Sequence, residues 1–386
     1  MRPGRFAACA AVAALTVGTA GAAHAASAAD ASPASAPKAA ANYGDVAGIL
    51  RRLTTTDGAP GALAEISDGR GRTTVLTSGV ADVATGAPMA ADSRFRIGSM
   101  TKMFVATVVL QLVAEHRVEL DAPIERYLPG MVRGNGDDGR NITVRQLLQH
   151  TSGLPDYMDY VSEQSVISDP LTHYSPQRLL SLALAHPALF APGTGWSYSN
   201  TNYVLAGLLI KAVTGHPYGE EIKRRIIEPL RLHDTFVPAD QSEIPGTHPH
   251  GYAEPPASAP VDVSEFNPSV AYASGAMISS GTDMNRFLSA LLHGRLLPPA
   301  ELRAMQTTTP TGDGSGSRYG LGLESVPLPC GGQFWGHDGG ILGFETMSGA
   351  TPHGRQATVM VNLNPGGTQA QDADIQAAVT AALCEA

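Results

Sequence analysis

The first part of the chain alternates between helical and strand patterns of apolar positions. Residues 43–53 repeat apolar side chains at helical spacing, on a side formed by Val46, Ile49, Leu50 and Leu53. Residues 61–67 and 73–80 are β-rich, and the turn at 68–71 (Asp-Gly-Arg-Gly) between them is typical of a hairpin. A long apolar helix is predicted from Ser99 to about His116.

Short helices and Pro/Gly-rich loops alternate from about residue 120 to 295. A helix capped by Thr143 is predicted to run to His150, and another at 202–213 to stop at Gly215. Strands follow at 320–324, 343–348 and 356–362, and a last helix at 372–384.

This order predicts an α/β fold in which one antiparallel sheet, flanked by N- and C-terminal helices, is split in sequence by a large, mostly helical insert. We divide residues 43–386 into an α/β part, 43–98 with about 296–386, and a mostly helical part, about 99–295. We expect a site in the cleft between the two.

The N-terminus has the pattern of a secretory signal peptide. Arg2 and Arg5 supply positive charge, residues 6–20 are apolar, and residues 23–25 (Ala-His-Ala) fit a cleavage site. We expect residues 1–25 to be removed and residues 26–42, rich in Ala, Ser and Pro, to form a disordered leader. The mature protein is then expected to be secreted (extracellular), without a stable membrane anchor.

The charge balance bears on possible binding partners, and the cysteine content bears on disulfide formation. The 26 basic and 35 acidic residues give a net charge of -9, which becomes 24 - 35 = -11 after loss of Arg2 and Arg5. This balance excludes nucleic acid as an expected partner. Cys9 leaves with the signal peptide, so Cys330 and Cys384 remain as a pair that we expect to form a disulfide in an oxidising compartment. The chain shows no coiled-coil pattern, and we expect a monomer.

The first candidate catalytic motif is Ser99-Met100-Thr101-Lys102 at the start of the long apolar helix. Positions i and i+3 share one helix face, and a helix N-terminus favours a developing alkoxide. A desolvated Lys102 would have a lowered pKa and could accept the serine proton. Alone, the pattern also fits an N-cap serine with a solvated lysine.

Two further motifs follow in order. Tyr198-Ser199-Asn200 is placed on a loop before a helix, where a phenol whose pKa is lowered by nearby cations could protonate a leaving nitrogen. His337-Asp338-Gly339, followed by Gly340, is placed at a strand start, where backbone N–H groups could bind a substrate carbonyl. Taken alone, the Tyr198 motif would also fit a turn at the start of a helix, and the His337 motif would fit an ordinary Gly-rich turn.

Together, the S-x-x-K, Y-x-N and H-x-G motifs resemble the serine β-lactamase and penicillin-binding-protein superfamily. The likeness is nearest to stand-alone secreted D-Ala-D-Ala carboxypeptidases and related D-peptidases and esterases. It spans about residues 43–384 and includes the segments Gln149–Pro155 and Tyr319–Leu323. The positions of Cys330 and Cys384 also resemble a disulfide of that group.

The resemblance implies an acyl-serine hydrolase that needs no metal or other cofactor and is acylated by β-lactams. Its substrates would be peptides or esters containing D-amino acids, with peptidoglycan fragments as further candidates. The implied roles are nucleophile for Ser99, general base for Lys102, proton shuttle for Tyr198, positioning for Asn200, and support of the hydroxyl network for His337. The backbone N–H groups of Ser99 and Gly340 would form the oxyanion hole.

The chain departs from the carboxypeptidase pattern where a substrate carboxylate would bind. Asp338 and Gly340 occupy hydroxyl positions, and Glu324 stands where the resembling enzymes have an arginine. We therefore assign Asp338, Gly339 and Glu324 to substrate binding, and keep a D-stereospecific aminopeptidase, endopeptidase or esterase beside the carboxypeptidase. Arg318 is an alternative source of the missing positive charge.

Further sequence features bear on other enzyme classes, on a metal site and on a protein without catalytic activity. An E-x-x-L-N string is absent, which disfavours a class A β-lactamase but leaves a class C-like one open. G-x-S-x-G is also absent, which disfavours an α/β-hydrolase. His248 and His250 lack a third nearby ligand and favour a plain surface loop over a metal site. A non-catalytic β-lactam- or peptidoglycan-binding protein is the non-enzyme alternative.

Overall fold

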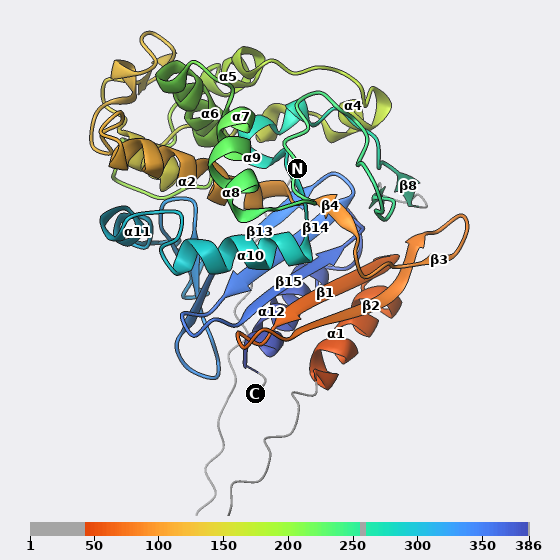
Figure 1. The fold of residues 1–386 in the computed structure, drawn as a ribbon. Coiled ribbons are helices and arrows are strands. Elements are labelled where there is room, and N and C mark those ends of the chain that lie inside the picture. Colours follow the sequence, from red (N-terminus) through yellow and green to blue (C-terminus); the bar gives the residue numbers. More distant parts are fainter. Residues whose placement is uncertain (1–42, 255–259, 385–386) are drawn as a thin grey trace, which may run out of the picture.

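The computed structural model describes residues 43–254 and 260–384. The predicted signal peptide (1–25) and leader (26–42) lie outside the described residues. Figure 1 shows a sheet with helices on both faces and a larger helical part beside it. The predicted α/β architecture is confirmed.

A nine-stranded sheet is assembled from both ends of the chain, in the order β10-β11-β12-β13-β14-β15-β1-β2-β3. Its strands are β1 (Gly61–Ser67), β2 (Thr73–Asp82), β3 (Ala87–Pro88), β10 (Thr309–Pro310), β11 (Arg318–Tyr319), β12 (Glu324–Pro327), β13 (Gln333–Ile341), β14 (Phe344–Ala350) and β15 (Gln356–Val361). The two sequence segments join where β1 pairs antiparallel with β15, Ala64 opposite Val359. The predicted hairpin is the β1–β2 pair.

Alternate side chains of β1 pack into two different hydrophobic cores, because successive side chains of a strand point to opposite faces of the sheet. Ala62 and Ala64 pack with α1 (Gly44–Thr55) and α12 (Gln371–Cys384) on one face. Leu63 faces the larger core, which includes Phe287 of α10 (Gly281–Leu292). Helix α10, at the end of the insert, covers the second face of the sheet (Figure 1).

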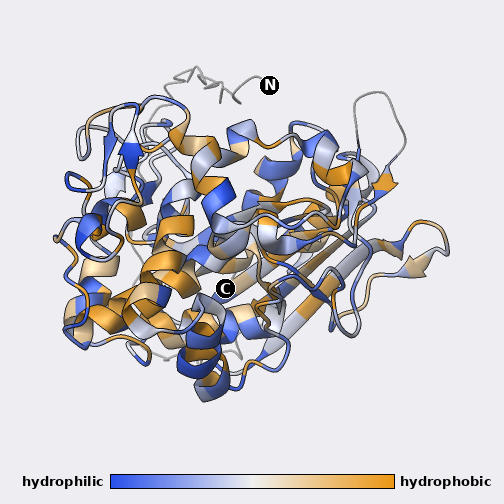
Figure 2. Ribbon diagram, turned by 90° about the horizontal axis from the view of Figure 1, so that it is seen from above, coloured by the Kyte–Doolittle hydropathy of each residue, from blue (hydrophilic) through white to orange (hydrophobic). Residues whose placement is uncertain are grey.

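The helical part is built around α2 (Thr101–Ala114) and α6 (Asn200–Thr214), which are apolar on nearly all sides. Figure 2 shows hydrophobic residues along the inner helices and hydrophilic ones toward the outer loops. The other helices are α3 (Val144–Leu148), α4 (Glu163–Ser168), α5 (Pro176–Leu184), α7 (Tyr218–Ile222), α8 (Glu228–Leu230), α9 (Tyr272–Gly275) and α11 (Pro299–Met305). Short ladders join β4 (Arg94–Arg96) to β9 (Ile278–Ser280), β5 (Arg133–Gly134) to β6 (Asp137–Asp138), and β7 (Tyr252–Ala253) to β8 (Val261–Asp262).

Several predicted boundaries are wrong in detail, and four of them bear on the site. Ser99 lies in the 3-10 turn η1 (Gly98–Met100), and the α-helix begins only at Thr101. Of the strand predicted at 320–324 only Glu324 is in a strand, as the first residue of β12. Residues 320–323 form a turn between β11 and β12, because Gly322 takes φ +70° against α2, a conformation that favours glycine. Helix α6 begins at Asn200 rather than 202. His337 lies inside β13 rather than at a strand start.

A covalent link joins the last helix to the sheet. Cys330, in the turn between β12 and β13, is disulfide-bonded to Cys384 at the end of α12. In the described residues no helix has the length and apolar character needed to cross a membrane.

Candidate active site

Ser99 lies where the sheet meets the helical part. Gly98 takes φ +50°, and a Cβ there would lie 2.8 Å from the carbonyl oxygen of Gly340 on β13. The turn that carries Ser99 can therefore rest directly on the strand that carries the H-x-G motif. Ser99 lines two hollows on the surface, one mainly apolar and one acidic.

Lys102 points its amine at the Ser99 hydroxyl. Its Nζ lies 2.9 Å from Ser99 Oγ and also donates to Asn200 Oδ1 and to the Ser274 carbonyl oxygen, both at 2.8 Å. The side chain is fully buried in the first turn of α2. Burial lowers the pKa of Lys102 to about 7, although nearby carboxylates, led by Asp156, oppose this shift. Near neutral pH, Lys102 can therefore exist as a free base beside Ser99.

Asn200 is held between Lys102 and a carboxylate. Its Oδ1 accepts from Lys102, and its Nδ2 donates to Asp156 Oδ2 at 2.8 Å. This pair of bonds fixes which end of the amide faces the lysine. Burial raises the pKa of Asp156. Sequence reasoning missed Asp156, which lies just after the Gln149–Pro155 segment.

Tyr198 faces the serine with a phenol that has no hydrogen-bond partner in the described part of the chain. Lys102 Nζ lies 4.7 Å from the centre of its ring. Burial, with Asp338 and Glu324 adding to it, nonetheless raises the pKa of Tyr198 well above its ordinary value, and the proximity of Ser99 only partly opposes this. The expectation that cations lower this pKa is wrong, because burial and acids outweigh the single amine. Tyr198 is therefore a neutral phenol that can give up a proton.

His337 lies on β13 with both ring nitrogens occupied. Nε2 lies 2.8 Å from Tyr319 Oη, while Nδ1 donates to the Asp338 carbonyl oxygen at 2.6 Å and lies 3.1 Å from Asp338 Oδ1. Burial lowers the pKa of His337, but Glu324 and Asp338 outweigh it, and the net shift is upward. No bond from His337 to Tyr198 is formed, and their ring centres lie 6.2 Å apart.

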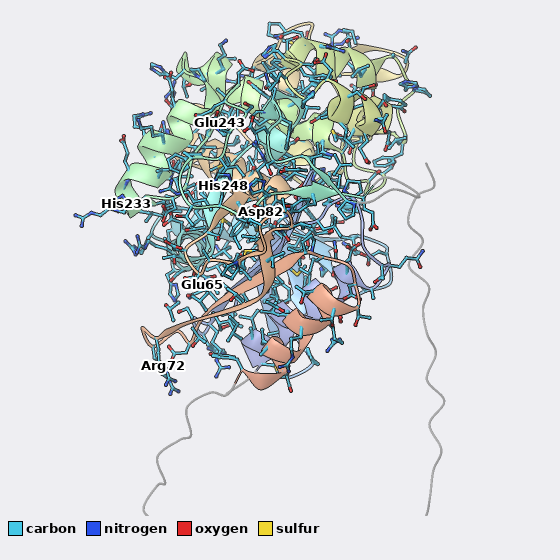
Figure 3. All side chains as sticks on the ribbon, turned by 90° about the vertical axis from the view of Figure 1, so that its right-hand side faces the viewer. Glu65, Arg72, Asp82, His233, Glu243 and His248 are labelled. Atoms are coloured by element: carbon cyan, nitrogen blue, oxygen red, sulfur yellow. A yellow bond between two sulfur atoms is a disulfide. The ribbon has the colours of Figure 1, made fainter. Side chains whose placement is uncertain are left out.

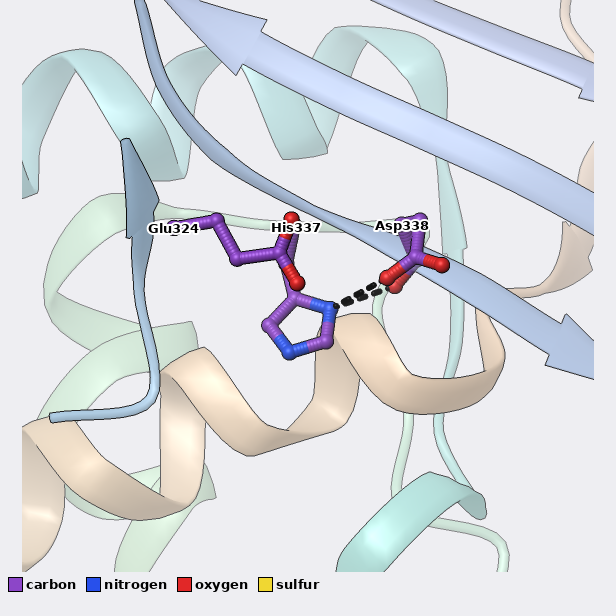
Figure 4. Close-up of side chains that lie close together, drawn as sticks. All are labelled: Glu324, His337 and Asp338. Carbon is purple, nitrogen blue, oxygen red and sulfur yellow. Dashed lines mark hydrogen bonds and ion pairs between the residues drawn. The ribbon is translucent and has the colours of Figure 1, made fainter. Parts of the chain in front are cut away.

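Glu324 and Asp338 approach one another beside His337 (Figure 4). Burial and the charge of Asp338 raise the pKa of Glu324 to about 7. The Asp338 side chain is 58% exposed and bonds to His337, which holds its pKa below the ordinary value against desolvation. Both acids line the acidic hollow with Asp313, Tyr198 and Ser99. Arg318 is not on that lining, because its guanidinium donates to Thr308 at 2.8 and 3.0 Å.

Gly339 and Gly340 hold the strand edge against Ser99. A Cβ on Gly339 would lie 2.1 Å from the Ile97 carbonyl oxygen, which precedes the nucleophile turn. Gly340 lines the apolar hollow with Ser99 and Asn200. Its N–H and that of Ser99 thus remain the candidate oxyanion donors.

The one group of three potential metal ligands that converge within 4.8 Å, among the described residues, is Glu324, His337 and Asp338. His248 and His250 instead line a surface hollow with Glu243, and Figure 3 labels His248 and Glu243. Their Nδ1 atoms bond to the Gly246 carbonyl oxygen and to Asp262 respectively.

The chain is similar to known proteins along most of its length. A family model described as beta-lactamase matches residues 46–382. The chain is 36% identical over 186 residues to "Esterase EstB" of Burkholderia gladioli, covering 46% of this chain and 47% of the esterase. It is 28% identical over 285 residues to "Penicillin-binding protein 4*" of Bacillus subtilis, covering 70% of this chain and 60% of that protein. The chain thus spans about half the length of the curated relatives it matches.

Solved structures give longer matches. A D-stereospecific amidohydrolase from Streptomyces sp. superposes with a TM-score of 0.82 at 40% identity, over 88% of this chain and 98% of that one. The D-amino acid amidase from Ochrobactrum anthropi SV3, solved with D-phenylalanine, gives 0.74 at 29% identity, over 87% and 97%. Since the family model spans most of the chain, this protein belongs to the beta-lactamase family of serine acyl-hydrolases.

Proposed function

We propose that this protein is a secreted D-stereospecific amidohydrolase, which cleaves amides of D-amino acids and peptides that begin with them. The observation that carries the proposal is the acidic hollow at Ser99, in which Glu324 and Asp338 stand beside Tyr198. The similarity to a D-stereospecific amidohydrolase and a D-amino acid amidase supports the choice of substrate.

The residues around Ser99 suit acyl transfer. Neutral Lys102 accepts the Ser99 proton as Oγ attacks the substrate carbonyl, and the N–H groups of Ser99 and Gly340 bind the oxyanion. Tyr198 donates its proton to the leaving nitrogen as the C–N bond breaks, and regains one from Lys102. Water then attacks the ester on Ser99, a proton returns to Oγ, and the D-amino acid is released.

The charge of the acidic hollow selects the leaving group. Tyr198 lines this hollow, so the nitrogen that it protonates must leave on that side. A D-alanine leaving group would bring its carboxylate toward Glu324 and Asp338, and like charges in a cleft repel. Ammonia, an uncharged amine or an alcohol meets no such repulsion, which favours an amidase over a carboxypeptidase.

The apolar hollow suits the side chain of the acyl group. It opens on the Asn200 and Gly340 side of Ser99, and its apolar lining includes Tyr157, Phe266 and Leu342. An aromatic or aliphatic D-side chain would bury apolar surface there at about 25 cal/mol per Å². We therefore expect D-phenylalaninamide to be a better substrate than D-alaninamide.

The proposal is tested by turnover of D-phenylalaninamide, L-phenylalaninamide and a peptide ending in D-Ala-D-Ala, each with wild type and Ser99→Ala. We expect the D-amide to be hydrolysed fastest, and only by wild type. Release of D-alanine from the peptide at a higher kcat/KM than ammonia from the D-amide would overturn it in favour of the carboxypeptidase.

Esterase activity is the second candidate, supported by the similarity to "Esterase EstB". The same acyl-enzyme would form from a D-aminoacyl ester, and an alcohol needs less protonation by Tyr198 than an amine. β-Lactams would acylate Ser99 in the same way, and intact-protein mass spectrometry with a penicillin would show the adduct.

A further inference from the structure

A buried hydrogen-bonded chain connects the helical part to the acidic hollow through His150, Tyr319 and His337. His150 follows α3, and both it and Tyr319 are 0% exposed. His150 Nε2 lies 3.3 Å from Tyr319 Oη, and Tyr319 Oη lies 2.8 Å from His337 Nε2. This series of hydrogen bonds ends at Asp338, which His337 Nδ1 contacts.

The donors around His150 determine where its proton is. The backbone N–H of Ser199 donates to Nδ1 at 3.1 Å, so Nδ1 carries no hydrogen. Asn202 Nδ2 lies at the same distance, and its Oδ1 accepts from Ser152, which orients the amide. Burial and the charges of Lys102 and His337 hold the pKa of His150 well below its usual value. The ring is neutral, and its one proton is on Nε2, directed at Tyr319.

The proton on His150 Nε2 determines the donors and acceptors in the remaining hydrogen bonds of the series. Tyr319 Oη accepts from His150, so its own hydrogen is free to donate to His337 Nε2. His337 Nδ1 faces two oxygens of Asp338 and must carry a hydrogen. Neutral His337 therefore has its proton on Nδ1, where Asp338 accepts it, and its lone pair on Nε2, where the Tyr319 hydroxyl donates to it.

His150 also touches the other side of the site. Its ring lies 4.4 Å, centre to centre, from the Tyr198 ring, and its partners Ser199 and Asn202 flank Asn200. One buried imidazole thus contacts the loop that carries Tyr198 and, through Tyr319, the strand that carries His337 and Asp338. The mechanism above uses neither His150 nor Tyr319.

We infer that His150 and Tyr319 are positioning residues, which fix the Tyr198 loop and the His337–Asp338 edge relative to each other. The effect on turnover rests on the proposed function, whereas the bonding pattern itself does not. The informative variant is Tyr319→Phe, which removes the hydroxyl and keeps the ring. Tyr218→Phe is the matched control, because Tyr218 is a buried tyrosine that lines a different hollow.

The test combines imidazole ¹⁵N NMR during a pH titration with kinetics on D-phenylalaninamide and on a D-phenylalanine ester. In wild type we expect His150 to be protonated on Nε2 and neutral His337 on Nδ1. In Tyr319→Phe both Nε2 resonances should move, and kcat should fall about tenfold with less change in KM, as expected for loss of one buried hydrogen bond to a functional group. Tyr218→Phe should match wild type in both.

A proton on His150 Nδ1, or neutral His337 protonated on Nε2, would overturn the inference. So would unchanged Nε2 resonances and unchanged kcat in a folded Tyr319→Phe. If wild type hydrolyses neither substrate, the proposed function fails, while the NMR result still decides the bonding pattern.

Discussion

Gly339 lies so close to the Ile97 carbonyl oxygen that a Cβ on the glycine would be 2.1 Å from it. No side chain fits at that distance, so strand β13 and the turn before Ser99 can be in contact only through a glycine. The Thr346 hydroxyl, 2.6 Å from the same Cβ position, closes the space on another side. This contact sets the distance between the nucleophile and the strand that is proposed to bind the substrate.

Gly339→Ala should therefore separate β13 from the nucleophile turn. We expect kcat/KM to fall about 100-fold or more, because a displacement of about 1 Å can cost that much. Gly48→Ala, in α1, is the control, since a Cβ there would meet no atom within 4 Å. Kinetics and thermal unfolding of both variants check this, and equal activity of the two would contradict it.

The sequence predicted the α/β fold with its split sheet because the strand and helix patterns were strong on both sides of the insert. His150 and Tyr319 stand in the two segments of the resemblance, Gln149–Pro155 and Tyr319–Leu323. Neither they nor Asp156 could be given a role in the site, since local sequence does not show which polar side chains are buried against one another. The raised pKa of Tyr198 could not be predicted from the sequence either, because it depends on how deeply the fold buries the phenol and on which acids lie around it.

The Cys330–Cys384 bond should stabilise the folded protein without affecting the active site. It closes 54 residues of chain, which corresponds to about 4 kcal/mol in the chain-entropy model. The double variant Cys330→Ser/Cys384→Ser should lose up to this amount in urea unfolding and keep its kcat. Adding a reductant to wild type should have the same effect. Identical unfolding of wild type with and without reductant would show that the cysteines are not joined.

Activity should increase with pH through the titration of Lys102. The neutral amine is the form that accepts the Ser99 proton, and burial lowers the pKa of Lys102 to about 7. The acid limb of kcat/KM should therefore lie near pH 7, with a plateau above it. Asp156 favours the protonated amine, so Asp156→Asn should move this limb to lower pH. It should also lower kcat, because Asn200 loses its charged partner.

Asp159→Asn is the control for that shift. Asp159 is three residues along the same turn and exposed, so its loss should leave the acid limb where it is in wild type. A limb that moves to higher pH in Asp156→Asn, or equally in both variants, would mean that Lys102 is not the group that titrates.

Reversing the charge at Glu324 should change the leaving group that the site accepts. Above pH 7 Glu324 carries a negative charge, and with Asp338 it faces the space beside Tyr198. Glu324→Arg leaves a cation there that can pair with a carboxylate. We expect kcat/KM for a peptide ending in D-Ala-D-Ala to rise about tenfold or more, and that for a cationic leaving group such as lysinamide to fall. Turnover of D-phenylalaninamide, whose leaving group is ammonia, should change less.

The control for net charge is Asp92→Arg, at an exposed position of the chain. It alters the total charge equally, so a general electrostatic effect on substrate encounter would appear in both variants and weaken with salt. A specific effect should appear only in Glu324→Arg and should persist at high ionic strength, because the pair would form inside the hollow. If the peptide and the lysinamide substrate respond alike to Glu324→Arg, the leaving group does not pass Glu324, and the acidic hollow cannot be what disfavours a carboxypeptidase.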